Sequence, residues 1–221
     1  AYAREAVQPT DRFERFNRSV YAFNTGLDRA VVRPIASGYS RLPRPVRSGV
    51  ANFLGNLAYP NTILNDFLQG KWRDGVRDVA RFAVNSVAGV GGLMDPASRA
   101  GLAKNDEDFG QTLGKWGVPS GPYLMLPLLG PSTLRDAPTW GVDYATDLRT
   151  YIDTDAISGG LAALRVVDTR ATVLVADATI DQAFDPYALV RDAYLQRREF
   201  KVRDGNVPSP HEEPLEDPGT E

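Results

Sequence analysis

The sequence predicts an all-α fold, and three observations lead to that prediction. Apolar residues recur every three or four positions in several long segments, which is the spacing of amphipathic helices. Gly and Pro residues separate these segments, as expected for joints between short helices. No two neighbouring segments alternate apolar and polar residues convincingly, and the β-branched run 171–175 is the main place where a strand fits. We therefore expect seven or eight short amphipathic helices.

The first helix is predicted from Asp11 onward. Asp11 with Glu14 three residues later is a variant of the capping box. One continuous apolar stripe follows at helical spacing, made of Phe13, Phe16, Val20, Phe23, Leu27 and Val31. Pro34 should kink or end this helix, and residues 38–45 are then a connector.

Three more helices are predicted before residue 93. The first covers about 46–58, and a short one from Asn61 to Gly70 follows Pro60. The third has the clearest helical period in the chain, carried by Trp72, Val76, Val79, Ala83, Val87 and Val90. The glycines at 89–92 are interpreted as the end of that helix, because they lack the third glycine and the preceding strand of a dinucleotide-binding turn.

The segment 93–131 is rich in Gly and Pro, and only short helices are expected there, near 95–102 and 106–113. Within it, residues 121–131 contain an apolar run that Pro127 interrupts. Proline disfavours both a central strand and a long helix. We therefore expect an apolar loop or a short hairpin.

The remaining helices are predicted at 133–149, at 160–183, and from Asp185-Pro186 to a basic end near Lys201. Residues 204–221 contain six acidic residues, no Lys or Arg, and no apolar period. The expected organisation is thus an N-terminal linker at 1–10, a helical domain at 11–203 and a disordered acidic tail at 204–221.

The composition argues against several kinds of chemistry. Cysteine is absent and the one histidine, His211, lies among Pro and Glu residues, so no thiolate site, histidine triad or histidine-based zinc cluster is expected. No stretch of about 18 apolar residues is present, and no transmembrane helix is therefore predicted. Asp106, Glu107 and Asp108 are better explained by a helix N-terminus than by a cation site. We expect no enzymatic activity, no catalytic residues, no metal and no cofactor.

Arginines gather near the N-terminus, where the first fifty residues contain nine Arg and four acidic residues. They flank the apolar stripe of the first helix, and three interpretations fit this pattern: a core-facing helix with solvated charges, a helix at a membrane interface, or a nucleic-acid surface. The apolar run within 121–131 favours the membrane, because water-soluble domains rarely display such a loop unless it is packed. A soluble helical binding module with a basic N-terminal face is the alternative, and a lipid hydrolase ranks third because Ser/His chemistry is missing.

Motifs over residues 11–200 resemble those of the VacJ/MlaA family of outer-membrane lipoproteins. In order, they are Asn17-Arg18-x-x-Tyr21-x-Phe23-Asn24, Leu27-Asp28, Val32-Arg33-Pro34, Asn52-Phe53-x-Gly55-Asn56-Leu57, Asn65-x-Phe67-Leu68-Gln69-Gly70, Arg81-Phe82-x-x-Asn85-Ser86, Gly89-x-Gly91-Gly92, Asp108-Phe109-Gly110-Gln111-Thr112-Leu113-Gly114, Gly121-Pro122-Tyr123 to Pro127, Gly130, Leu134-Arg135-Asp136, Asp185-Pro186-Tyr187 and Tyr194-x-x-Arg197.

The resemblance implies a ring-like array of helices in the inner leaflet of the outer membrane of a Gram-negative bacterium. A central channel would remove mislocalised phospholipid from the outer leaflet and pass it to a soluble periplasmic carrier, which maintains lipid asymmetry. The implied partners are outer-membrane phospholipids, a trimeric porin and that carrier, with no nucleic acid. Family members are anchored by an acylated N-terminal Cys, and we attribute its absence here to trimming at or beyond that residue.

Two groups of residues are then candidates for the site. Candidate lipid-binding or channel residues are Phe16, Arg18, Tyr21, Phe23, Asn24 and Arg33. Candidate residues of a mobile hairpin at the channel mouth are Tyr123, Leu124, Leu126, Pro127, Leu128 and Leu129. Arg18 and Arg33 are either phosphate contacts or ordinary charges on a helix surface.

Overall fold

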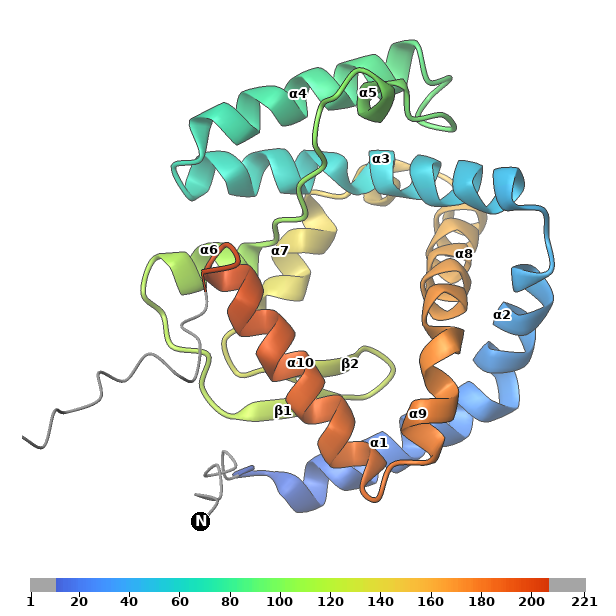
Figure 1. Ribbon diagram of the computed structural model, residues 1–221, viewed down its shortest axis with the longest axis vertical. Helices are drawn as coiled ribbons and strands as arrows, with labels where there is room; N and C mark the ends of the chain where they lie inside the picture. The colour runs from blue at the N-terminus through green and yellow to red at the C-terminus, as the bar shows by residue number, and fades with distance from the viewer. Residues whose placement is uncertain (1–10, 207–221) are drawn as a thin grey trace, which may run out of the picture.

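Helices dominate the computed structural model, which describes residues 11–206, and they are arranged in a ring (Figure 1). The N-terminal helices are α1 (Glu14–Leu27), α2 (Arg33–Ser40), α3 (Arg44–Leu68), α4 (Trp72–Val87), α5 (Pro96–Arg99) and α6 (Phe109–Lys115). The later helices are α7 (Thr139–Ala145), α8 (Asp155–Val173), α9 (Asp177–Asp181) and α10 (Pro186–Val202). The prediction of an all-α fold is confirmed.

The first helix does not end at Pro34. A π-helical turn, η1 (Asp28–Val32), joins α1 directly to α2. The Arg33 amide bonds to the Asp28 carbonyl across this turn, and Pro34 follows in the first turn of α2. A proline in a first turn removes an N–H that needs no partner there, so its cost is small. The predicted connector therefore shrinks to the few residues between Ser40 and Arg44.

The break predicted at Pro60 is also wrong, because α3 continues through it. An internal proline removes one helical hydrogen bond and costs about 3 kcal/mol. Polar anchors on the following turns offset this cost. Among them, the Thr112 hydroxyl lies 2.6 Å from Asn65 Oδ1, which ties the end of α3 to α6.

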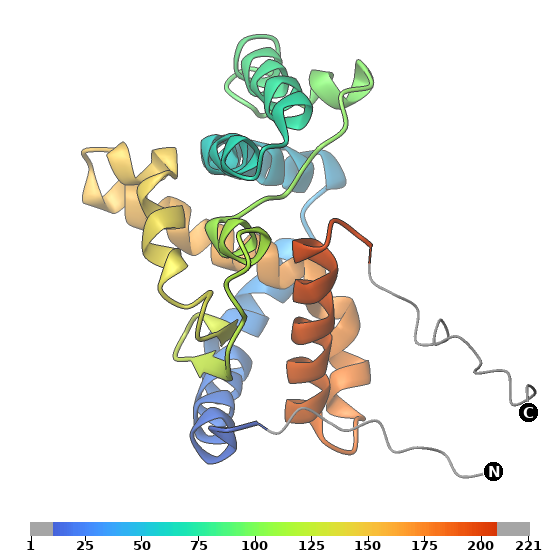
Figure 2. The same cartoon turned by 90° about the vertical axis from the view of Figure 1, so that its left-hand side faces the viewer.

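Helix α4 lies on the outer side of α3, and α5 follows it (Figures 1 and 2). The periodic apolar residues that predict α4 face outward: Trp72 is 66% exposed and Val87 is 85% exposed. Its buried positions are instead Gly75, Asp78 and Arg81. The amphipathic helix is confirmed, but its packed side is the polar one.

The apolar segment forms a hairpin. Strand β1 (Tyr123–Leu126) pairs antiparallel with β2 (Gly130–Thr133), with Tyr123 opposite Thr133 and Leu126 opposite Gly130. Leu128 at the turn and Gly130 after it both have positive φ, at 65° and 85°. Since β2 extends to Thr133, the helix predicted from 133 begins only at Thr139 and is followed by a 3-10 turn, η2 (Leu148–Tyr151).

The C-terminal third is helical throughout its described part. The run 171–175 is not a strand, because it forms the end of α8 and the 3-10 turn η3 (Leu174–Ala176). Asp185 caps α10 by accepting a hydrogen bond from the Ala188 amide at 3.1 Å, as predicted. The predicted linker 1–10 and tail residues 207–221 lie outside the described part, while Asp204 at the start of the predicted tail pairs with Lys115 at 2.8 Å.

The interior is unusually polar. Buried polar and charged residues outnumber buried hydrophobic ones, and fully buried side chains include Asn17, Asn65, Asp66 and Asp78. The apolar core is a small cluster made of Val20, Tyr123, Met125 and Tyr187. Many large hydrophobic residues on α1, α2 and α4 face outward instead. No helix within residues 11–206 is long and apolar enough to cross a membrane.

Candidate functional site

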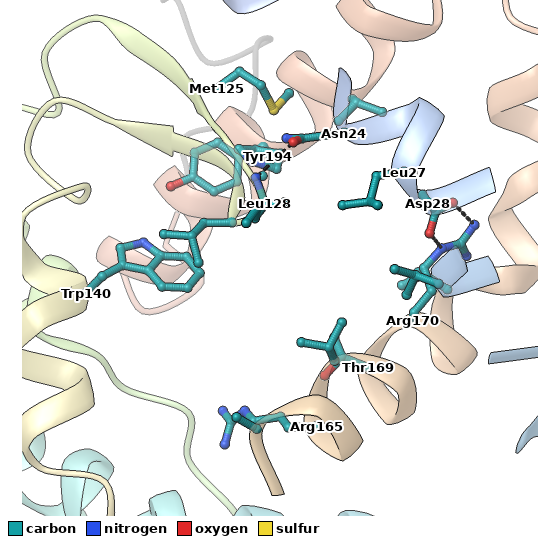
Figure 3. A pocket seen from close by; sticks show the side chains of 18 of the residues that line it. Asn24, Leu27, Asp28, Met125, Leu128, Trp140, Arg165, Thr169, Arg170 and Tyr194 are labelled. Carbon is teal, nitrogen blue, oxygen red and sulfur yellow. Dashed lines mark hydrogen bonds and ion pairs between the residues drawn. The ribbon is translucent and has the colours of Figure 1, made fainter. Parts of the chain in front are cut away.

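The ring of helices encloses a cavity of about 1590 Å³ (Figure 3). Residues from α1, η1, α3, the segment 106–108, the hairpin, α7, α8, α9 and α10 line it. Because segments from the whole length of the chain contribute, the cavity is a property of the ring and not of one motif.

One side of the cavity is apolar. The hairpin contributes Met125, Leu128 and Leu129, α1 contributes Leu27, and α7 contributes Trp140. Figure 3 shows Leu128 and Trp140 on the same side of the space. Leu128 is 70% exposed although its hydrophobic side chain is large. This side is suited to hydrocarbon.

The opposite side lies along α8, where Arg165, Thr169 and Arg170 line the space (Figure 3) together with the apolar Val166 and Val173. Arg170 is paired with two carboxylates, since it bonds to Asp28 at 2.7 Å and to Asp177 at 2.8 Å. These contacts join α8 to the first helical segment and to α9, which closes the ring on that side. Among the residues that the structure describes, the ion pair of Arg165 is a long contact of 3.9 Å to an oxygen of Asp147.

A second charged cluster joins α10 to α6 and the hairpin. Arg198 bonds to Asp108 at 2.5 Å and to Asp136 at 2.8 Å. Burial alone would raise the pKa of both carboxyls. Arg198 outweighs it at Asp108, and Arg135 together with Arg198 outweighs it at Asp136, so each pKa lies below its usual value. Gly110 of α6 is required here, because a Cβ would stand 2.2 Å from an Arg198 nitrogen.

Asp143 and Asp147 differ although both line the cavity on the α7 side. Burial raises the pKa of Asp143, which accepts hydrogen bonds from the Asn61 amide at 3.1 Å and the Phe109 backbone N–H at 3.0 Å. Burial also opposes ionisation of Asp147, but Arg149 bonds to it and lowers its pKa. The cavity therefore contains one carboxyl whose pKa is raised by burial and one whose pKa is lowered by an arginine.

Two asparagines of α1 attach the hairpin to the ring. The Asn17 side chain donates to the Tyr123 carbonyl at 3.1 Å and accepts from the Met125 amide at 2.8 Å. Seven residues later, the Asn24 side chain donates to the Leu126 carbonyl and accepts from the Leu128 amide, both at 2.9 Å. Each side-chain amide thus makes the two hydrogen bonds that a neighbouring strand would make with the hairpin backbone, and together they fix the hairpin at the edge of the cavity.

The structure brings some of the predicted site residues together. Tyr21, Asn24 and Arg33 line the cavity, as do Leu128 and Leu129 of the hairpin. Arg33 is paired with Asp177 at 2.9 Å, and the Asn24 side chain is engaged by the hairpin backbone. Their roles in binding lipid stay predictions.

Other predicted residues lie away from the cavity lining. Phe16 and Phe23 are more than half exposed on α1, and Arg18 pairs with Glu14 and Asp185 while its guanidinium stacks on the Tyr187 ring. In the hairpin, Tyr123 is buried in the apolar cluster. The remaining hairpin candidates, Leu124, Leu126 and Pro127, belong to β1 and its turn and are not among the lining residues.

Sequence reasoning did not single out several residues that line the cavity, chiefly Met125, Trp140, Asp143, Arg165 and Arg170. Most of them lie in α7 and α8, on the side of the ring far from α1 in sequence. The available signal was a pair of arginines, Arg165 and Arg170, in a helix that is otherwise mostly apolar. Thr169 lies one helical turn after Arg165 and next to Arg170. Within residues 11–206, no group of three or more His, Asp or Glu side chains is placed to hold a metal ion.

Comparison with known proteins identifies relatives over nearly the whole chain. The family model described as MlaA lipoprotein matches residues 9–201. The Shigella flexneri and Escherichia coli proteins named "Intermembrane phospholipid transport system lipoprotein MlaA" are each 40% identical to this chain over 212 residues, which is 93% of this chain and 83% of theirs. The Haemophilus influenzae protein of the same name is 34% identical over 92% of this chain and 84% of its own length.

The fold matches a solved structure as well. That structure was described as "Structural basis for maintenance of bacterial outer membrane lipid asymmetry", and it superposes with a TM-score of 0.77 at 38% sequence identity. The match covers 87% of this chain and 99% of the solved one. The relatives therefore share the ring of helices and not only isolated motifs.

Proposed function

The chain belongs to the MlaA lipoprotein family, and from this premise we propose that its central cavity passes phospholipid from the outer membrane towards the periplasm. The protein lies in the inner leaflet, takes mislocalised phospholipid from the outer leaflet and delivers it to a soluble periplasmic carrier. It is bound to a trimeric porin and anchored by an N-terminal acyl chain in the full-length protein. The passage needs no covalent chemistry, cofactor or metal.

The observation that carries this proposal is the two-sided cavity. A phospholipid has a charged headgroup and two hydrocarbon chains, so a passage for it must satisfy both. The hairpin and Trp140 offer hydrocarbon contacts, while α8 offers Arg165 and Thr169 on the opposite side (Figure 3). A cavity of about 1590 Å³ exceeds the usual range for small-molecule sites, which fits a ligand with two long chains.

The outer surface supports a position within one leaflet. Phe16 and Phe23 of α1, Ile35 of α2, and Trp72 and Val76 of α4 are all more than half exposed. Helices with such apolar faces lie in the plane of a membrane interface. This arrangement also strengthens attachment, because one acyl chain alone gives only marginal binding.

The alternative of a soluble module that uses a basic N-terminal face receives less support from the geometry. Arg18, Arg29 and Arg33 are each within 3 Å of a carboxylate oxygen from the C-terminal part of the chain. Their charges are therefore paired with carboxylates of the same chain. A nucleic-acid surface would instead leave such arginines available to phosphates.

The proposal is tested with a phospholipid whose acyl chain carries a photoactivatable diazirine, incorporated into vesicles with the purified chain. We expect labelling on two surfaces after illumination: Val76 and Val79 on the outer face of α4, and Leu128, Leu129 and Trp140 inside the cavity. Peptide mapping by mass spectrometry separates the two sets. A variant with a disulfide between residues introduced on the hairpin and on α8 across the cavity should lose only the inner set.

Each pattern of labelling has a clear meaning. Labelling of the outer face alone would show a membrane-bound protein whose cavity does not hold lipid, and it would contradict the proposed passage. Absence of labelling on both surfaces, combined with no flotation on vesicles at low or high salt, would support the soluble alternative. Flotation that survives high salt is expected, because apolar insertion is not screened by ions.

A further inference from the structure

A smaller pocket of about 410 Å³ opens beside the central cavity. Its walls are α3, the segment 104–106 and α8, and it shares Ala58, Thr62, Asp106 and Arg165 with the lining of the central cavity. The α3 wall consists of small side chains. A Cβ added at Gly55 would stand 3.7 Å from Lys104 Nζ, so this glycine leaves the space beside the lysine open. The pocket is thus a side branch of the cavity.

Two cations line this pocket, Lys104 from the segment before α6 and Arg165 from α8. Within residues 11–206, Lys104 makes no hydrogen bond or ion pair, and Arg165 makes no hydrogen bond and only the 3.9 Å contact to Asp147. The other cations that line the cavity are each within about 3 Å of a carboxylate oxygen. Figure 3 shows the Arg165 side chain extending from α8 into the space.

Two of the three carboxylates around Arg165 are paired with other cations, and the third accepts from a neutral hydroxyl. Asp147 is bonded by Arg149, Asp106 lies 2.5 Å from Lys201, and Asp168 accepts from the Tyr39 hydroxyl at 2.8 Å. Burial and the nearby Arg149 both lower the pKa of Arg165, which identifies a cation held where charge is not fully compensated. Positive charge is therefore in local excess in this branch.

We propose that Lys104 and Arg165 form the subsite that binds the phosphate of a phospholipid headgroup, with the acyl chains directed toward the hairpin. This inference rests on the proposed function and adds to it where the headgroup lies and which residues select it. Arg offers a planar fork that matches phosphate oxygens, and Lys supplies a point charge beside it. Because the branch opens onto the apolar cavity, a lipid phosphate fits better than a free anion.

The test measures binding of two tail-labelled fluorescent lipids to the purified chain in a non-ionic detergent. The two probes are phosphatidylglycerol and diacylglycerol, which share their chains and differ in the phosphate. We expect the chain to bind phosphatidylglycerol about tenfold or more tightly than diacylglycerol, as hydrogen bonds to a charged group would give. In the double variant Lys104→Gln/Arg165→Gln this preference should fall close to one, with diacylglycerol affinity unchanged.

Two further variants make the outcome specific. The control Arg41→Gln/Arg99→Gln removes the same charge from exposed positions outside both pockets, and it should keep the preference. Gly55→Leu fills the side branch without changing charge, and it should lower phosphatidylglycerol binding selectively. A double variant that keeps the preference, or a control that loses it equally, would overturn the assignment.

The remaining outcomes separate this inference from the function on which it rests. If the chain binds both lipids equally well, the cavity holds lipid but the phosphate subsite is wrong. If it binds neither lipid, the proposed function fails and the inference fails with it. The last arm is a titration with inorganic phosphate. If phosphate binds and its binding depends on Lys104 and Arg165, while neither lipid binds, the pocket is assigned to a free anion.

Discussion

The α3–α4 pair and the hairpin side of the ring are held together in opposite ways. Between α3 and α4 the buried groups are polar: the Tyr59 hydroxyl bonds to Asp78 at 2.9 Å, and Arg81 bonds to that hydroxyl at 3.1 Å. On the hairpin side, Tyr123 packs edge-on against Tyr187 at 6.2 Å and Met125 fills the space beside them. The first interface depends on ionic and hydrogen-bonding groups, and the second depends on apolar packing.

The difference follows from what each region exposes. Helix α4 contacts the rest of the chain mainly through α3 and α5, so its apolar residues are left for the outer surface. Only its polar side remains to make the interface. The hairpin side has no such constraint, because α1 and α10 enclose it and apolar residues can be buried. A helix with an apolar outer face therefore requires a fully satisfied polar inner face, since any unpaired buried group is costly.

The largest effect is expected for Arg81→Ala, which breaks the polar interface. Arg81 is 2% exposed and bonds to Tyr59, Ser98, Asp95 and the Leu102 carbonyl. Removing one partner of a buried pair costs about 3–5 kcal/mol, because the remaining charge has no compensation. Chemical denaturation in detergent should show this loss, whereas exposed Arg73→Ala on the same helix should change stability by no more than about 0.5 kcal/mol. Equal effects of the two variants would show that the network does not hold α4.

A smaller effect is expected for Asn17→Ala on the hairpin side. Asn17 is fully buried, and its loss leaves the Tyr123 carbonyl and the Met125 amide without partners. The cost should be about 1–3 kcal/mol, with the apolar cluster still packed. Near-ultraviolet circular dichroism of the tyrosine cluster should therefore change little while the unfolding midpoint falls. Loss of the tyrosine signal would show that the hydrogen bonds, and not the packing, hold this side together.

Asn24→Ala should have a weaker and more local effect, because its contacts are partly exposed. The Asn24 side chain holds the hairpin turn through the Leu126 carbonyl and the Leu128 amide. We expect about 1 kcal/mol of lost stability and faster hydrogen exchange at the Leu128 amide, with exchange in α10 unchanged. Ser19→Ala on the same helix removes only a hydrogen bond to the helix backbone and should leave the turn protected. Unchanged exchange at Leu128 in Asn24→Ala would exclude a role for this side chain in positioning the turn.

The sequence predicts the helices well but not which side of them is packed. The stripe from Trp72 to Val87 correctly indicates α4, yet periodicity is the same for a face that meets a core and a face that meets a membrane. Only the ring arrangement distinguishes the two. The errors at Pro34 and Pro60 have a related cause, because in both places neighbouring structure tolerates a proline that would end an isolated helix.

The candidate site was only partly predictable for a different reason. The hairpin and α1 contribute Leu128, Leu129, Tyr21 and Asn24, and their motifs stand out in the sequence. Arg165 lies in α8, more than a hundred residues from α1, and within the described residues its lack of a close ion-pair partner depends on where Arg149, Lys201 and Tyr39 lie in space. No spacing rule along the chain encodes that arrangement.

The last expected effect concerns pH, and its sign differs between the two regions. Burial and the neighbouring Asp78 raise the pKa of Asp66, between α3 and α4, to about 8. A proton held on Asp66 can bond to Asp78 Oδ2, whereas without it neither Asp66 oxygen nor Asp78 Oδ2 has a donor within the described residues. The unfolded chain releases this proton near pH 4, so stability from this region falls as pH rises from about 4 to 8. Arg198 holds the pKa of Asp108 low, and Arg135 with Arg198 holds that of Asp136 low, so their contribution is instead lost as pH falls below about 4.

Hydrogen-exchange protection factors, measured from pH 5 to pH 9, should therefore decline for amides of α4 and stay level for amides of α10. Asp66→Asn supplies a permanent donor to Asp78 and should flatten the decline. Asp74→Asn is the matched control, because Asp74 is a partly exposed carboxylate of the same helix, which pairs with Arg77 three residues later. The carboxyl pair is responsible for the difference between the two regions only if the pH dependence of protection in α4 disappears in Asp66→Asn and persists in Asp74→Asn. A slope that is common to α4 and α10 would show that the ring unfolds as one unit, and that its polar and apolar interfaces are energetically coupled.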